Sequence, residues 1–152
     1  MNSRLRLGGA LMALAGLGFV AYAGIFFAMN FTDSFLELGI GPEQVDVSRE
    51  EIREFSPDLY HYISHVQIAA GGFIAAVGLA VTALSWFGVR AAQGWAWVAA
   101  VVVPVVGLAI ALPAHYPWGF DTIGHLGLVY ADTILLVVGA AIAGAALRTA
   151  KA

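Results

Sequence analysis

The sequence has no cysteine and little charge, and both features narrow the classes of protein to which it can belong. Without cysteine, disulfide bonds, thiolate metal sites and a cysteine nucleophile are all excluded. Charged residues make up 11% of the 152 residues, whereas an ordinary soluble domain carries roughly 25%. The net charge is −3 and no basic stripe offsets it, so we expect no nucleic acid partner.

Several sequence motifs are also missing. There is no glycine-rich phosphate loop, no nucleophile-elbow motif with an ordered catalytic triad, and no nucleotide-binding fingerprint. Lysine occurs only at Lys151, while arginine is used elsewhere, and this bias indicates a GC-rich prokaryotic genome.

Apolar sequence dominates what is present. Hydrophobic residues make up 61% of the chain and the mean hydropathy is +0.84, which predicts an integral membrane protein in contact with the lipid bilayer. Runs of about 20 apolar residues are enough to cross the hydrocarbon core. Four such runs occur, at about residues 5–29, 57–88, 93–112 and 122–147. We therefore predict one all-α domain over residues 1–152, a bundle of four transmembrane helices.

The first span also has features of a signal peptide, because Arg4 and Arg6 precede the apolar run and Ala21-Tyr22-Ala23 is similar to a cleavage site. The run nevertheless continues through Ala28, and this length favours a retained helix.

Residues 30–56 form the only long polar segment, and we expect them to cap one end of the bundle. Ser48 and Glu51 have the spacing of a capping box, which predicts a short amphipathic helix over residues 49–55. Ile52 and Phe55 of this helix should pack on the mouth of the bundle. Gly39 should end a preceding turn.

Capping residues also mark the ends of the spans. Ser56 followed by Pro57 predicts the start of the second span. Pro113 should end the third span, and Asp121 should cap the fourth.

Basic residues set the expected orientation. They lie at the N-terminus, between the second and third spans, and at the C-terminus, whereas most acids lie in the opposite loops. The positive-inside rule then places both termini in the cytoplasm and the loops at 30–56 and 113–122 outside a plasma membrane.

This topology gathers all four histidines at the outer end. His61 and His65 lie one helical turn apart near the start of the second span, so they share a face. His115 follows the third span and His125 lies near the start of the fourth. We predict His65 and His125 as the central ligands of one outward-facing pocket.

Three aspartates accompany these histidines. Asp58 shares the face of the histidine pair on the second span, and Asp121 and Asp132 share the face of His125 on the fourth. Asp132 lies about two turns deeper than His125, where an ionisable side chain is costly unless it is paired or hydrated. We therefore include Asp58, Asp121 and Asp132 with His61, His65, His115 and His125 as candidate metal ligands or orienting groups.

The pattern leaves the chemistry open. One hypothesis is a transition metal, because imidazole suits zinc, copper and iron. Another is haem b held by His65 and His125, with small residues below them leaving room for the ring. Neither pattern specifies a reaction, so whether the protein is an enzyme stays uncertain.

Two further hypotheses lie outside cofactor binding. Small residues such as Gly71 and Gly72 also suit close helix packing, which fits an accessory or scaffold subunit of a homo-oligomer or a larger membrane complex. A proton or cation relay through the histidines and Asp132 ranks third, because the cytoplasmic halves of the spans are almost purely apolar.

Overall fold

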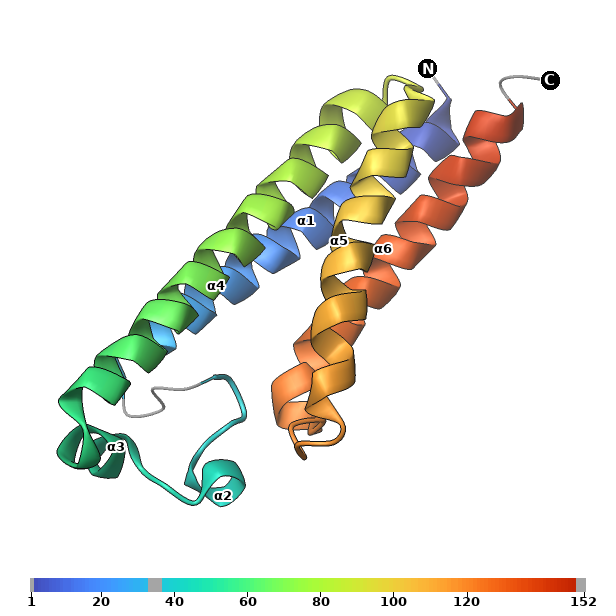
Figure 1. Ribbon diagram of the computed structural model, residues 1–152. Coiled ribbons are helices and arrows are strands. Elements are labelled where there is room, and N and C mark those ends of the chain that lie inside the picture. Colours follow the sequence, from blue (N-terminus) through green and yellow to red (C-terminus); the bar gives the residue numbers. More distant parts are fainter. Residues whose placement is uncertain (1, 33–36, 150–152) are drawn as a thin grey trace.

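The computed structural model describes residues 2–32 and 37–149, and helices dominate these residues (Figure 1). Four helices are long and apolar enough to cross a membrane. They are α1 (Ser3–Met29), α4 (Pro57–Ala83) continued by the π-helical turn η1 (Leu84–Val89), α5 (Gly94–His115) and α6 (Ile123–Thr149). The chain is therefore an all-α membrane bundle with four spans, as predicted.

Figure 1 shows the start of α1 and the end of α6 at the same end of the bundle, here called the terminal end. The opposite end, here called the loop end, carries two short helices, α2 (Pro42–Val45) and α3 (Arg49–Phe55), and the connection between α5 and α6.

The capping residues predicted at the starts of α3 and α4 form the expected hydrogen bonds. The Ser48 hydroxyl accepts a hydrogen bond from the backbone N–H of Glu51 at 3.2 Å. The Glu51 carboxylate accepts one in return from the Ser48 N–H at 2.7 Å, so the capping box of α3 is complete. The Ser56 hydroxyl accepts from the backbone N–H of Leu59 at 3.2 Å and caps α4. These contacts confirm the predicted bounds of α3 and the start of the second span.

Helix α1 is central, because α4 and α6 both pack mainly against it. Glycines allow this close approach. A methyl group at Gly16 would lie 2.7 Å from the carbonyl oxygen of Gly78 on α4. One at Gly8 would lie 2.8 Å from the carbonyl oxygen of Gly139 on α6. Only residues without a side chain fit at such helix contacts.

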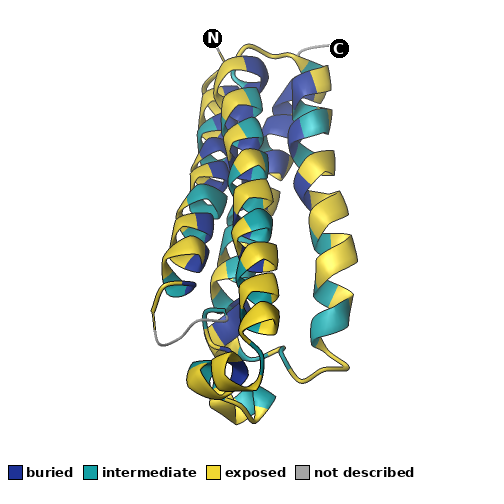
Figure 2. Cartoon of the chain, turned by 60° about the vertical axis from the view of Figure 1, so that its left-hand side comes forward, coloured by how far each residue is buried: buried dark blue, intermediate teal, exposed yellow. Residues whose placement is uncertain are grey.

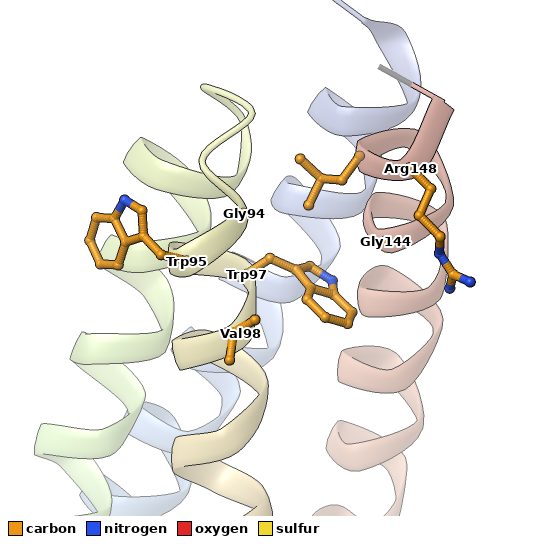
Figure 3. A pocket seen from close by; sticks show the side chains of 7 residues that line it. Gly94, Trp95, Trp97, Val98, Gly144 and Arg148 are labelled. Carbon is orange, nitrogen blue, oxygen red and sulfur yellow. The ribbon is translucent and has the colours of Figure 1, made fainter. Parts of the chain in front are cut away.

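The tightest packing lies toward the terminal end, where most buried residues gather (Figure 2). Trp97 of α5 donates a hydrogen bond from Nε1 to the carbonyl oxygen of Ala140 on α6, at 2.9 Å. Figure 3 shows its ring directed toward Gly144, where an added methyl would come within 2.9 Å of the ring. Toward the loop end, by contrast, residues 105–115 of α5 include no buried residue.

Three sequence predictions need correction. Helix α5 does not end at Pro113 but continues to His115, because a membrane helix tolerates the carbonyl that proline leaves without a hydrogen bond. Helix α6 is capped by Thr122, whose hydroxyl accepts from the His125 N–H at 3.2 Å, and not by Asp121. Phe55 is 84% exposed, so of the two apolar residues assigned to the bundle mouth only Ile52 is buried.

Candidate metal centre

Three side chains that could bind a metal ion meet at the loop end. Glu37 comes from the segment after α1, His115 is the last residue of α5, and His125 lies in the first turn of α6. Each offers one ligand atom, and the three atoms lie within 4.8 Å of one another. Within the described residues this is the one group of three or more histidine, aspartate or glutamate side chains with such spacing.

His125 is the most enclosed member of the group, with its side chain 1% exposed. Its Nδ1 lies 2.8 Å from the carbonyl oxygen of Leu38. A carbonyl only accepts hydrogen bonds, so Nδ1 must carry the proton. In the neutral ring, Nε2 then keeps its lone pair and lies 3.3 Å from Oε2 of Glu37.

Gly39 explains how the loop reaches His125. Its φ of +73° lies in the left-handed region, which glycine adopts without steric cost. A methyl group at this position would lie 2.3 Å from the carbonyl carbon of Gly124 and 2.5 Å from the His125 nitrogen. The loop backbone therefore rests on the first turn of α6, and the Leu38 carbonyl is positioned to accept from the imidazole.

His115 completes the group from α5. Its Nδ1 lies 2.9 Å from the carbonyl oxygen of Ala111, one turn back along the helix, so this nitrogen also carries a proton. The His115 and His125 rings stack, with centroids 5.0 Å apart and planes at 26°. The continuation of α5 beyond Pro113 is what carries His115 to this position.

Glu37 supplies the only carboxylate of the group. Burial raises the pKa of its carboxyl above the ordinary value of 4.5, and the neighbouring His125 and His115 partly oppose this rise. The side chain keeps 32% exposure, so the group is open on one side. An anionic ligand beside two imidazoles is a common donor set for a divalent transition metal.

The contact between His125 and Glu37 tests whether an ion would fit. Two ligands with metal bonds of about 2.0–2.1 Å in tetrahedral geometry are separated by about 3.4 Å. The observed separation is 3.3 Å. Nε2 of His125 is buried and has no hydrogen-bond partner in the described parts of the chain. Buried polar atoms normally have a partner, and a metal ion bound at this nitrogen would supply one.

The other predicted histidines lie elsewhere. His61 and His65 are both exposed on α4, and His61 packs against the Tyr60 ring with centroids 5.6 Å apart. Helices α4 and α6 lie against α1 rather than against each other (Figure 1), so His65 and His125 do not line the one pocket that the sequence predicted. The ligand roles of His61 and His65 stay predictions.

The three predicted aspartates are also outside the group. Asp58 is exposed in the first turn of α4, and Asp121 is exposed before α6. Asp132 is half-buried deeper along α6, where it faces Gly18 of α1. Their metal-binding roles stay predictions as well.

Glu37 is the member that sequence reasoning did not single out, because it was counted only as one of seven acids in the polar segment. One signal was available. Glu37 lies between two leucines in the run FLELGI, two residues before the turn glycine Gly39. An acid within an apolar run next to a turn glycine is a candidate for partial burial.

Comparisons with protein-family models, with curated proteins and with solved structures found no match to this chain. Its function must therefore be argued from its own residues. What these residues establish is a multi-pass membrane protein with a Glu37, His115 and His125 group that could hold a metal ion.

Proposed function

We propose that this protein binds a first-row transition metal ion at the loop end, through Glu37, His115 and His125. The observation that carries the proposal is the hydrogen bonding of the two imidazoles. Each ring donates Nδ1–H to a backbone carbonyl, of Leu38 for His125 and of Ala111 for His115. Metal-binding histidines are commonly held in this way, because the bond fixes the tautomer that leaves Nε2 free to coordinate.

Zinc is the ion that the donor set favours. Two imidazoles and one carboxylate are a typical three-residue zinc set, which leaves a fourth position for water or a second ligand. Copper binds most nitrogen and oxygen sites more tightly than zinc, so selectivity must be measured against it. The absence of cysteine agrees with a site built from nitrogen and oxygen ligands.

The geometry favours a metal ion over haem. A haem iron at Nε2 of His125 would need the place that the Glu37 carboxylate takes, 3.3 Å away. Its second predicted ligand, His65, is exposed on α4. An ion pair is the alternative explanation of the contact between His125 and Glu37. It forms when Nε2 of His125 carries a proton instead of a metal ion.

We place the loop end outside the plasma membrane. The terminal end carries Arg4, Arg6, Arg90 and Arg148, and positive charge marks the cytoplasmic side of short loops. The proposed metal would then exchange with the extracytoplasmic medium, on the side where the Glu37 edge of the group is open.

The test is a zinc titration of the chelator-treated full chain in lipid nanodiscs, by calorimetry with elemental analysis. We expect one zinc per chain. His125→Ala and Glu37→Gln should each weaken binding at least about 10-fold, as loss of a ligand or its support does. His61→Ala and His65→Ala are matched controls, because they remove exposed imidazoles outside the group, and they should leave the affinity unchanged.

Two outcomes would overturn the proposal. One is the absence of stoichiometric zinc or copper binding by the folded wild-type chain. The other is binding that survives in His125→Ala but disappears in His65→Ala, which would move the site to α4. Loss of metal binding together with stable co-purifying subunits would favour the accessory-subunit hypothesis instead.

A further inference from the structure

A hollow with two arginine side chains lies at the terminal end, between the start of α1 and η1, and its volume is about 440 Å³. The described residues that line it are Ser3, Arg6, Leu7, Ala10, Trp86 and Arg90. Leu7 is 54% exposed and Trp86 is 47% exposed, so the hollow opens on the outer surface of the bundle. The first span begins and the second span ends here (Figure 1), so this surface meets the lipid headgroups of the membrane.

Packing holds the Arg90 side chain in this hollow. Its guanidinium carbon lies 3.7 Å from the centroid of the Trp86 ring, which is a cation–π contact. Its aliphatic part crosses α1 at Gly9, where an added methyl group would lie 2.5 Å from Cγ of Arg90. Because these contacts already restrain the side chain, Arg90 loses less conformational freedom when it binds an anion.

The positive charge of this hollow is not neutralised by the described parts of the chain. Neither Arg6 nor Arg90 forms an ion pair with a carboxylate in residues 2–32 or 37–149, and no acid is among the described lining residues. Ser3 is the first residue of the 27-residue helix α1, and the start of a helix also favours a bound anion. The hollow therefore attracts a negatively charged group and has no described group that would pair with a cation.

We propose that this hollow binds the headgroup phosphate of an anionic phospholipid from the surrounding bilayer. Phosphate oxygens accept hydrogen bonds from Arg6 and Arg90, because the planar donor fork of a guanidinium matches a phosphate. Leu7 and Ala10 lie one and two helical turns deeper along α1, where they face the glycerol and the first acyl carbons of the lipid.

The polar rim and apolar floor of the hollow favour a lipid over a free phosphate ion. Basic pockets between membrane helices recognise anionic headgroups in this way. A zwitterionic lipid fits less well, because no acid among the described lining residues would pair with its cationic group. Lipid binding here does not depend on metal binding at the loop end.

The test is native mass spectrometry of the full chain in detergent, titrated with phosphatidylglycerol or with phosphatidylcholine of the same acyl chains. We expect one phosphatidylglycerol per chain, bound at least about 5-fold more tightly than phosphatidylcholine. Arg6→Gln and Arg90→Gln should each weaken phosphatidylglycerol binding about 10-fold, the usual effect of losing a hydrogen bond to a charged group.

Arg4→Gln is the matched control. Arg4 is an exposed arginine of the same helix that is not among the residues lining the hollow, so its replacement removes the same charge from the same end of the bundle. Salt screens exposed charges that do not touch the lipid, so this variant should bind phosphatidylglycerol as the wild type does. Circular dichroism checks the fold of each variant. Arg6 is exposed, so Arg6→Gln tests the site even if Arg90→Gln disturbs the packing on Trp86.

Four results would contradict this assignment. The first is equal affinity of the wild type for the two lipids, and the second is unchanged affinity in folded Arg6→Gln. The third is an equal loss in Arg4→Gln, Arg6→Gln and Arg90→Gln, which would indicate diffuse attraction of anionic lipid to the whole terminal end. The fourth is displacement of phosphatidylglycerol by an equal concentration of inorganic phosphate, which would identify the free ion as the ligand.

Discussion

Nε2 of His125 lies 3.3 Å from the Glu37 carboxylate, although α4 and α5 separate the two residues along the chain. This contact joins the segment after α1 to the start of α6. It also places a titratable acid beside a nitrogen that either a proton or a metal can occupy. Several measurable properties depend on which of them is bound.

Zinc affinity should fall as the pH falls. Metal ligands must be deprotonated, so protons compete with zinc for the two imidazoles and for Glu37, whose carboxyl pKa burial raises. Between about pH 7.5 and pH 5.5 the apparent affinity should drop at least about 10-fold. Calorimetry in buffers of different ionisation enthalpy should also detect proton release. Zinc binding that does not depend on pH would contradict the assignment of these ligands.

Glu37→Gln should stabilise the metal-free protein near neutral pH. The carboxyl pKa is raised in the folded state, so its contribution to stability is complete below the ordinary value of 4.5 and is lost as the pH rises through the raised value. A neutral amide does not undergo this loss. Thermal unfolding should therefore separate the two proteins at pH 7 and not at about pH 4, and zinc should reverse their order at pH 7. A variant that is less stable than wild type at pH 7 without metal would contradict the argument.

Gly39→Ala should weaken both the fold of the loop and zinc binding. A left-handed conformation costs a residue with a side chain about 1–2 kcal/mol, and the new methyl would also collide with the backbone at Gly124. Displacing the loop removes the Leu38 carbonyl from His125, so zinc affinity should fall at least about 10-fold. Gly119→Ala is the matched control, because Gly119 has a similar φ of +74° but open space around it. Gly119→Ala should lower the stability of the fold by a similar amount but leave the zinc affinity unchanged.

Gly16→Ala should loosen the pair formed by α1 and α4. A methyl group there would meet the Thr82 hydroxyl at 2.4 Å and the Gly78 carbonyl oxygen at 2.7 Å, so the helices must separate. Overpacking of this kind costs about 1–3 kcal/mol. Gly24→Ala lies in the same helix with no atom within 4 Å, and should be neutral or slightly stabilising. Unfolding in mixed micelles compares the two, and equal midpoints would show that this contact is not tight in the folded protein.

The amino-acid sequence by itself determined the membrane class, the four spans, and the bounds of α3 through Ser48 and Glu51. These features depend on hydropathy and on hydrogen bonds between residues three positions apart, so short stretches of sequence carry them. The same local reasoning failed at Pro113, because the surroundings of a membrane helix decide whether proline ends it.

The tertiary structure alone decided which polar residues meet. Sequence periodicity placed His65 and His125 on helix faces, but it could not show that α1 lies between α4 and α6, which follows from glycine contacts such as Gly16 with Gly78. Nor could it show that the loop turns at Gly39 and carries Glu37 to His125. Helix order and the path of a loop depend on contacts between distant residues, and these form only when the whole chain packs.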